Sequence, residues 1–404
     1  MAPGVNNMDS LHNMPARAPT KTVAIGVVGL GRMGKRHAKT LMYRTPSAKL
    51  VAVCTIAEAE LKWAREFFGP GSGVTVYDSY DRMLEHQGLE AMWVSTSTDL
   101  HAVQANAAIA KGLHVLCEKP LSTSIEEAQS VVDAANANPH LKVMAGYSRR
   151  FDASYRDAKA KIDAGAIGTP FMVRSQTGDL RDDTGFFVRY AAKNGAVFVD
   201  CSIHDVDLTM WFLGEDLVPK TVFAIGTLTH HPELAQSRDV DNGIAVVEFW
   251  GGKMAYYAAS RTQAHGQDVA TEIIGTHGKI MVNVIPRIVS AFTQHPIPST
   301  TTTTDPTTTD LEQQNHVQIA SATGISHEVP PEYWERFEDA FATEANEFID
   351  AILEDKPVPV PMRLGVKGMK IAWALQHALW HNKSLHFDRE GNRIDGPAEA
   401  DVKN

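Results

Sequence analysis

The sequence is poor in cysteine and has no long apolar run. Its 404 residues include three cysteines, and Cys54, Cys117 and Cys201 lie far apart. This number and spacing exclude a disulfide framework and a Cys-x-x-Cys metal site and favour a reducing compartment. No run of about 18 apolar residues occurs, and the first residues lack the apolar centre of a signal peptide. We therefore expect a soluble, cytoplasmic protein with no membrane partner.

Positive charge is also in the minority. Lys plus Arg number 38 and Asp plus Glu number 48, so the formal net charge is −10 at pH 7. A net acidic chain without blocks of like charge is a poor partner for nucleic acid or an anionic bilayer, and we expect no nucleic-acid binding. Hydrophobic residues make up 44%, enough to build cores, and the length suits two or three domains.

Short apolar segments alternate with helical patterns between residues 21 and 146. We predict strands at 23–29, 50–55, 74–77, 91–95, 114–117 and 142–146. Continuous apolar strands separated by helices indicate a parallel sheet that is buried on both faces. The sequence therefore predicts a doubly wound α/β domain over 21–146, preceded by a flexible tail over 1–20.

The pattern changes after residue 146. We predict a helix over 153–164, a strand over 171–177, and a second helix from Asp200 to Gly214. Further strands are predicted over 220–227, 243–250, 253–260, 270–275 and 279–283, and closing helices over 335–353 and 363–380. Successive strands with short turns imply a mostly antiparallel sheet. We therefore predict a C-terminal α+β domain over 147–385 that binds substrate, with the ligand cleft between the two domains.

Two segments are expected to lie outside these cores. Residues 296–330 contain the stretch PSTTTTTDPTTTD, which has no apolar spacing. Its composition is typical of a flexible, solvated insertion, and we assign it no function. Residues 386–404 are predicted to form a C-terminal tail.

A glycine motif follows the first predicted strand. Gly29, Gly31 and Gly34 form Gly-x-Gly-x-x-Gly at the opening of a helix. The first glycine suits a tight turn, the second lets the backbone approach a pyrophosphate, and the third lets helix and strand pack closely. Because the motif opens a βαβ unit, it favours binding of NAD or NADP over a purely structural turn. The predicted cofactor-binding residues are Gly29, Gly31, Arg32, Met33, Gly34, Thr55, Ser95, Thr96, His101, Glu118 and Lys119.

The choice between NAD and NADP stays open. The second predicted strand ends in Thr55, and Glu58 and Glu60 come only later. An acidic residue at the end of this strand would bind the ribose 2′-hydroxyl and repel a 2′-phosphate. No Arg or Lys follows closely to bind such a phosphate either.

Lys119 is a candidate for chemistry on a substrate hydroxyl. It follows the predicted strand 114–117 at its C-terminal end, where ligands bind in open parallel sheets. A charged lysine in this position can donate to a substrate oxygen and stabilise a developing alkoxide. Without further context, an ordinary surface lysine is the alternative interpretation.

Asp200 and His204 form the second candidate site. They are four residues apart, which on a helix places both on one face. Histidine suits proton transfer near neutral pH, and a carboxylate beside it can bind a neighbouring hydroxyl or orient the ring. Asp200 could instead be a helix N-cap, and Asp205 and Asp207 could complete a metal cluster. A metal site needs further ligands, so we expect none.

Four motifs together resemble the Gfo/Idh/MocA family of NAD(P)-dependent oxidoreductases, within it the inositol 2-dehydrogenase-like members. They are GLGRMGKRH at 29–37, CEKPLS at 117–122, GYSRRFDASY at 146–155 and DCSIHDVD at 200–207. The resemblance spans residues 23–382 and implies a Rossmann domain followed by a domain whose open sheet forms a homo-oligomer, a dimer or tetramer. It also implies that Lys119, Asp200 and His204 stand at the family's catalytic positions.

The resemblance further implies the substrate class. It places substrate contacts at Ser148, Arg149, Asp200, His204, His265 and Gln267. At Ser148, His265 and Gln267 the inositol enzymes carry a methionine and two tyrosines. Because these three contacts differ, the resemblance implies the wider substrate class of cyclic polyols and sugars and not inositol itself. Our leading hypothesis is oxidation of a secondary hydroxyl by hydride transfer to nicotinamide.

Two alternatives stay open. They are an NADPH-dependent dihydrodiol or sugar-ketone reductase, and a dinucleotide-sensing regulator of the same fold without catalysis. A regulator would be free to lose its catalytic residues, so the presence of Lys119, Asp200 and His204 favours an enzyme.

Overall fold

The computed structural model describes residues 21–283, 318–321, 324–327 and 333–394. Within them the chain forms two compact units. Unit 1 contains the residues up to Ser148 together with Asp339–Val366, and unit 2 contains Arg149–Glu338 and the residues from Lys367 onward. The predicted tail over 1–20 lies outside the described residues, as do most of the insertion predicted over 296–330 and the last ten residues of the chain.

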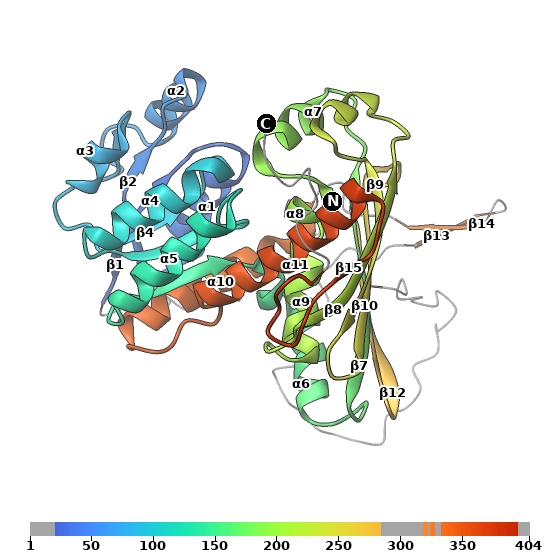
Figure 1. Cartoon of the computed structure of the whole chain (residues 1–404). Helices are drawn as coiled ribbons and strands as arrows, with labels where there is room; N and C mark the ends of the chain where they lie inside the picture. Colours follow the sequence, from blue (N-terminus) through green and yellow to red (C-terminus); the bar gives the residue numbers. More distant parts are fainter. Residues whose placement is uncertain (1–20, 284–317, 322–323, 328–332, 395–404) are drawn as a thin grey trace, which may run out of the picture. The chain divides into compact units, whose positions relative to one another are not determined.

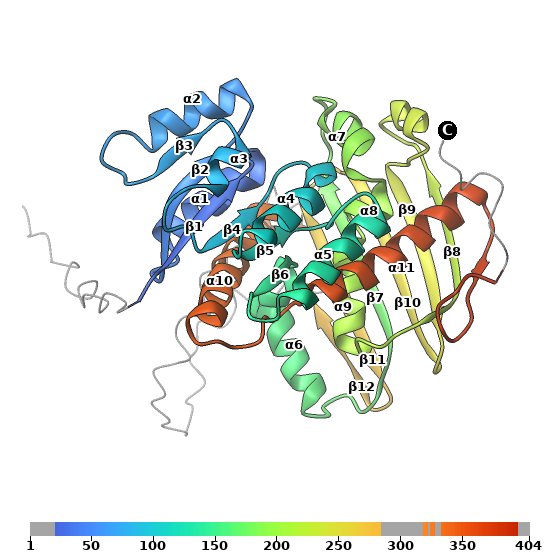
Figure 2. The same ribbon diagram turned by 60° about the vertical axis from the view of Figure 1, so that its left-hand side comes forward.

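Unit 1 is built on a parallel six-stranded sheet with the order β3-β2-β1-β4-β5-β6. Figure 2 labels its strands, and Figure 1 labels the helices between them. Its strands are β1 (Val23–Val28), β2 (Ala48–Cys54), β3 (Thr75–Tyr77), β4 (Ala91–Val94), β5 (His114–Glu118) and β6 (Val143–Gly146). The helices between them are α1 (Arg32–Tyr43), α2 (Glu58–Phe67), α3 (Tyr80–Leu84), α4 (Thr98–Ala110) and α5 (Ile125–Ala137). Every residue of β4 and β6 is buried, as expected for parallel strands covered on both faces. The predicted doubly wound sheet is confirmed.

The order in which the chain adds strands to this sheet reverses between β1 and β4. β1 pairs with β2 on one side and with β4 on the other. A reversal of strand order leaves a crevice at the carboxyl ends of the two strands, which is where open α/β sheets bind ligands. The fold therefore places the glycine turn after β1 at the position suited to a dinucleotide.

Helix α10 (Tyr333–Leu353) and the segment after it complete the core of unit 1. The rings of Phe341 and Phe348 lie 5.5 Å from His37 and 6.5 Å from Trp93 between centroids. The sequence places these residues in the C-terminal domain, whereas Asp339–Val366 belongs to unit 1. Apolar spacing shows that a helix has a buried face, but it does not show which core receives that face.

Unit 2 is built on a seven-stranded sheet with the order β12-β11-β7-β10-β9-β8-β15 (Figure 2). The strands are β7 (Pro170–Leu180), β8 (Pro219–Thr227), β9 (Asn242–Phe249), β10 (Lys253–Gln263), β11 (Asp268–Gly275), β12 (Gly278–Val282) and β15 (Leu385–His386). β7 and β10 pair in parallel, and the other pairings of this sheet are antiparallel. The predicted mostly antiparallel sheet is confirmed.

Helices cover one face of this sheet. They include α6 (Ala153–Asp163), α7 (Phe186–Asn194), α8 (Val197–Asp200), α9 (Ile203–Leu213) and α11 (Met362–His381), with short 3-10 helices η1 (Ser148–Phe151) and η2 (Pro232–Ser237). α9 packs on β7 and β10. A two-stranded hairpin of β13 (Gln318–Ser321) and β14 (Gly324–His327) lies within the predicted insertion.

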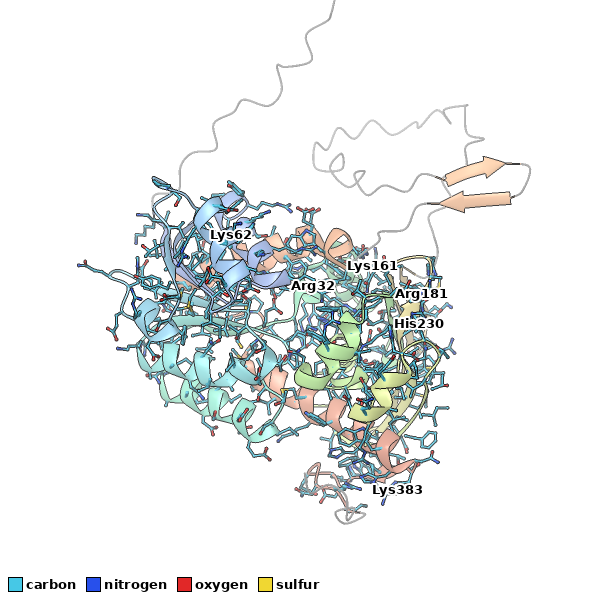
Figure 3. All side chains as sticks on the ribbon, turned by 90° about the horizontal axis from the view of Figure 1, so that it is seen from above. Arg32, Lys62, Lys161, Arg181, His230 and Lys383 are labelled. Carbon is cyan, nitrogen blue, oxygen red and sulfur yellow. The ribbon has the colours of Figure 1, made fainter. Side chains whose placement is uncertain are left out.

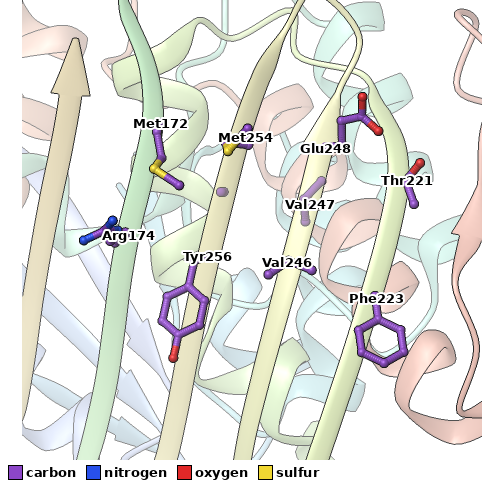
Figure 4. Close-up of a pocket in the computed structure, with 10 residues that line it drawn as sticks. Met172, Arg174, Thr221, Phe223, Val246, Val247, Glu248, Met254 and Tyr256 are labelled. Atoms are coloured by element: carbon purple, nitrogen blue, oxygen red, sulfur yellow. The ribbon is translucent and has the colours of Figure 1, made fainter.

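The opposite face of the sheet carries apolar side chains at the surface. Outward-facing residues alternate with buried ones, as in β9, where Val246 is 44% exposed and Val247 is buried. Figure 4 shows this face, with a shallow pocket lined mainly by Met172, Phe223, Val246, Met254 and Tyr256 among other residues. Large exposed apolar patches on proteins often coincide with interaction sites.

Two adjacent arginines tie helix α9 into unit 2. Arg149 Nη1 donates to Asp205 Oδ1 at 3.0 Å, and Arg150 Nε and Nη2 each donate to an oxygen of Asp207 at 2.8 Å. All four side chains are buried. Burial raises the pKa of Asp205 and Asp207, while Arg149 and Arg150 oppose that rise. The motifs at 146–155 and 200–207 therefore meet as two buried ion pairs.

Removing one carboxylate tests how much these ion pairs matter to the stability of unit 2. We expect Asp205→Ala to lower the free energy of unfolding by about 3–5 kcal/mol, because it leaves the Arg149 charge buried without its partner. Asp157→Ala is the control, since Asp157 pairs with Lys161 at the surface and should cost less than about 0.5 kcal/mol. Denaturant unfolding measures both, and equal losses would contradict the account.

Candidate active site

The turn between β1 and α1 uses its three glycines for different reasons. Gly29 has a φ of +85°, and a Cβ there would lie 2.6 Å from the Ser95 carbonyl oxygen. A Cβ on Gly34 would lie 1.7 Å from the Gly29 oxygen. Gly31 has an ordinary φ of −67°, and a Cβ there would meet nothing nearer than 3.8 Å. The open space over Gly31 fits a pyrophosphate that approaches the backbone at the N-terminus of α1.

Side chains connect the strand ends around this turn. The Ser95 hydroxyl, after β4, donates to the Gly29 carbonyl oxygen at 3.0 Å. The ring nitrogens of His101 lie 2.8 Å from the Pro120 carbonyl oxygen and 3.1 Å from that of Thr96. Burial lowers the pKa of His101 despite these carbonyls. The segments after β1, β4 and β5 are thereby held together.

The end of β2 carries a contact that the sequence did not suggest. Thr55 is buried, and its hydroxyl donates to the carboxylate of Glu60 in the first turn of α2. Arg32 and Met33 begin α1, and Arg32 is exposed there (Figure 3). Glu60 was not among the predicted site residues. The available signal was its position in the helix turn directly after the strand-ending threonine.

Glu118 supports the backbone of Lys119 from within the core. Its Oε1 lies 2.7 Å from His37 Nε2, and its Oε2 accepts from the Lys119 N–H at 3.2 Å. Burial acts to raise the pKa of Glu118, but His37 and Lys119 outweigh it and lower the pKa. Burial and the charge of Glu118 raise the pKa of Glu344 well above its usual range. The shifts therefore favour the charged form of Glu118 and the neutral form of Glu344.

Asp200 and His204 lie on two short helices instead of one. α8 ends at Asp200 and α9 begins at Ile203. The helical stretch predicted after Asp200 is confirmed as α9, but Asp200 lies outside it, so the expectation that Asp200 and His204 share one helix is wrong. The Ser202 N–H donates at 3.3 Å to the carbonyl of Val197, five residues back. The turn between the helices is therefore wider than a turn of α-helix, whose hydrogen bonds span four residues. Asp200 is also not an N-cap, because Ser202 is the residue that precedes α9.

Asp200 belongs to a buried polar network. The Tyr190 hydroxyl donates to its Oδ1 at 3.3 Å, and Arg261 Nη2 lies 3.6 Å from its Oδ2. Arg261 also donates to Asp239 Oδ2 at 2.9 Å. Burial acts to lower the pKa of Arg261, but Cys201, Asp239 and Asp200 raise it above its ordinary value. Arg261, which the sequence analysis missed, therefore places a fixed positive charge beside Asp200. Its signal was an arginine at an inward position of an alternating strand.

The remaining predicted substrate residues lie in different environments. Arg149 is 3% exposed, and its guanidinium donates to Asp205 and to Thr177 Oγ1. Ser148 and Gln267 are buried, whereas His265 is exposed in the loop between β10 and β11. The structure gives Arg149 a role in holding α9, and substrate contact by these residues stays a prediction.

The described ranges offer little for metal binding, membrane insertion or thiol chemistry. Among these residues, no group of three or more His, Cys, Asp or Glu side chains could hold a metal ion. The part of the chain that the structure describes also has no helix long and apolar enough to cross a bilayer. The three cysteines are buried and form no disulfide. Burial, and then Asp78, raises the pKa of Cys54 to about 12, so its thiolate is scarce at neutral pH.

Comparison with known proteins covers both units. Residues 23–147 match the family model of an oxidoreductase family with an NAD-binding Rossmann fold, and residues 155–281 match the GFO/IDH/MocA C-terminal domain. The scyllo-inositol 2-dehydrogenase (NAD(+)) of Bacillus subtilis (strain 168) is 31% identical over 336 residues, which are 83% of this chain and 87% of the relative.

Solved structures give the same picture. The crystal structure of scyllo-inositol dehydrogenase from Lactobacillus casei with bound cofactor NAD(H) and scyllo-inositol has a TM-score of 0.79 and 32% identity. The match covers 91% of this chain and 99% of that one. The myo-inositol 2-dehydrogenase from Lactobacillus plantarum has a TM-score of 0.79 and 28% identity, over 91% of this chain and 100% of that one.

The open space over Gly31 yields a prediction. Gly31→Ala should keep the free energy of unfolding within about 1 kcal/mol of wild type, since the new methyl meets no protein atom closely. It should weaken NADH binding by about tenfold or more, because the methyl occupies the approach of the pyrophosphate. Nucleotide fluorescence and thermal melting measure the two effects. Gly34→Ala should instead lower stability, and unchanged NADH binding by Gly31→Ala would contradict the assignment.

Proposed function

The chain belongs to the Gfo/Idh/MocA family of oxidoreductases, and from this membership we propose that it oxidises a secondary hydroxyl of a cyclic polyol. The observation that carries the proposal is the match over 87% of a scyllo-inositol 2-dehydrogenase in a chain that has Lys119, Asp200 and His204. All three relatives described above are named inositol dehydrogenases. Scyllo- and myo-inositol are therefore the first substrates to test, followed by sugars.

The glycine turn and the residues at the strand ends hold the dinucleotide. Backbone N–H groups at the start of α1 bind its pyrophosphate, and Gly31 leaves room for it. When bound, NAD supplies a hydride acceptor at its nicotinamide ring. The fixed arrangement of Ser95, His101 and Pro120 supports this role, because it keeps the ends of β1, β4 and β5 in register.

Three side chains act on the substrate alcohol. His204 takes the proton of the reacting hydroxyl, as a histidine can near neutral pH. Lys119 donates to the same oxygen and stabilises its growing negative charge. Asp200 accepts from a neighbouring hydroxyl, and the charge of Arg261 with the Tyr190 hydroxyl keeps its carboxylate oriented. Glu118, which lies against His37, accepts from the Lys119 N–H and so holds the Lys119 backbone in place.

A substrate screen tests this proposal. Purified protein is mixed with NAD or NADP and with inositols, aldoses or sugar acids, and the reduced nicotinamide is followed by absorbance. We expect turnover with at least one inositol. Tight dinucleotide binding without turnover of any polyol or sugar would contradict the enzyme and favour the dinucleotide-sensing regulator.

Replacing the lysine tests the assigned chemistry. Lys119→Met should lower kcat by about 10²–10⁴-fold, because it removes the group that stabilises the alkoxide, and this loss should far exceed any change in NADH affinity. Lys111→Met is the matched control, since Lys111 pairs with Glu85 at the surface of the same unit. Near-normal turnover of Lys119→Met would contradict its role.

We further propose that the exposed face of the seven-stranded sheet joins copies of this chain into a dimer or tetramer. Its apolar side chains support this, since Val246 and Met254 remain 44% and 42% exposed in the single chain. A second copy would bury them against an equivalent face, as closed oligomers with two-fold symmetry do.

A charge placed on this face tests the association. Val246→Asp should shift the protein to smaller species in sedimentation velocity, because an unpaired carboxylate is costly to bury at an interface. Lys161→Asp, on exposed α6, is the control for an added acidic charge and should keep the wild-type mass. A monomeric wild type, or a Val246→Asp variant of wild-type mass, would contradict the proposal.

A further inference from the structure

The carboxylate of Glu60 faces the glycine turn from the end of β2. The Thr55 hydroxyl, at the carboxyl end of that strand, donates to Glu60 Oε2. The other oxygen, Oε1, lies 3.8 Å from the position of a Cβ on Gly31. One oxygen is therefore anchored to the strand end, while the other lies beside Gly31 of the glycine turn.

The end of β2 is the place where the hydroxyls of the adenosine ribose are bound in this kind of fold. In this kind of sheet an acidic residue at the end of the second strand binds the hydroxyls of the adenosine ribose. Thr55 stands where that residue is expected, and it is too short and uncharged to do so alone. However, Glu60 lies in the first turn of α2, and its hydrogen bond with Thr55 holds its carboxylate next to the end of the strand.

Neighbouring residues suit an adenosine. Ile56 directly follows Thr55 and is 81% exposed, so it offers an apolar surface on which an adenine ring can lie. The segment from Thr55 to Glu60 contains two glutamates and no lysine or arginine. A 2′-phosphate at this point would meet negative charge, and the basic residues Arg32 of α1 and Lys62 of α2 lie outside the segment.

We propose that Glu60, held by Thr55, binds the adenosine ribose hydroxyls and makes this chain select NAD over NADP. Glu60 is then a specificity-determining residue, and Thr55 is a positioning residue that acts through it. The inference deepens the proposed function, on which it rests only in requiring that the chain binds a dinucleotide.

A purely structural role for Glu60 makes a different prediction. Glutamate in the first turn of a helix is favoured by the helix dipole, and Thr55 Oγ1 also accepts from the Ala57 N–H at 3.4 Å. If Glu60 served only the start of α2, its replacement would change thermal stability and leave the preference between the two nucleotides as it is. The ratio of the two affinities therefore separates the interpretations.

The experiment measures dissociation constants of NADH and NADPH on the purified full chain by nucleotide fluorescence, without any polyol. We expect the wild type to bind NADH at least about tenfold more tightly than NADPH. Glu60→Gln, which keeps the size and removes the charge, should shift the ratio toward NADPH by about tenfold or more. Thr55→Val should shift it in the same direction by less.

Glu58→Gln is the matched control, because it removes the same charge from an exposed position in the same helix turn. It should keep the wild-type ratio. Equal ratios in wild type and Glu60→Gln, or a wild type that prefers NADPH, would overturn the inference. NADH binding without turnover of any polyol would overturn the proposed function alone. A chain that binds neither nucleotide would overturn both.

Discussion

The close approach of Gly34 to the carbonyl oxygen of Gly29 fixes the turn between β1 and α1, and with it the start of α1. A Cβ on Gly34 would lie 1.7 Å from that oxygen, so α1 starts where it does only because no side chain intervenes. The tight turn aims the first N–H groups of α1 at the space over Gly31. Ser95 then ties the end of β4 to the same carbonyl. The phosphate site is thus a property of the backbone, and the net charge of −10 has no bearing on it.

Buried charge plays the corresponding part in unit 2. Arg149 and Arg150 hold Asp205 and Asp207 on α9, and Arg261 lies beside Asp200 at the end of α8. Desolvating such groups is costly, and removing one partner costs more than the pair contributes. The arrangement therefore specifies a single position for the α8–α9 corner. His204 and Asp200 inherit that position, and their proposed catalytic roles require such a fixed position.

Much of this could be predicted from the sequence, for identifiable reasons. Buried parallel strands are continuous apolar runs, so β1 to β6 were recognisable, and alternation with short turns indicated the antiparallel sheet. The glycine motif and Lys119 were placed by their positions relative to strands. The predicted roles of Lys119, Asp200 and His204 stay predictions. Contacts between segments far apart in the sequence could not be predicted, such as those of Arg261 with Asp200 and of Phe341 with His37. The contact of Thr55 with Glu60 is local, but it depends on how α2 begins after β2. The break between α8 and α9 could not be predicted, because Cys201 and Ser202 include no proline or glycine that would end a helix.

The central claim is that a hydrogen attached to a polyol carbon is passed as hydride to NAD. Scyllo-inositol that is deuterated at every ring carbon tests it directly, with the reduced nucleotide analysed by proton NMR after a single round of turnover. The account predicts one deuterium at nicotinamide C4 for each inositol oxidised, and slower turnover than with the protiated substrate. Reduced nucleotide without deuterium, or inositol recovered unchanged beside bound NAD, would contradict it.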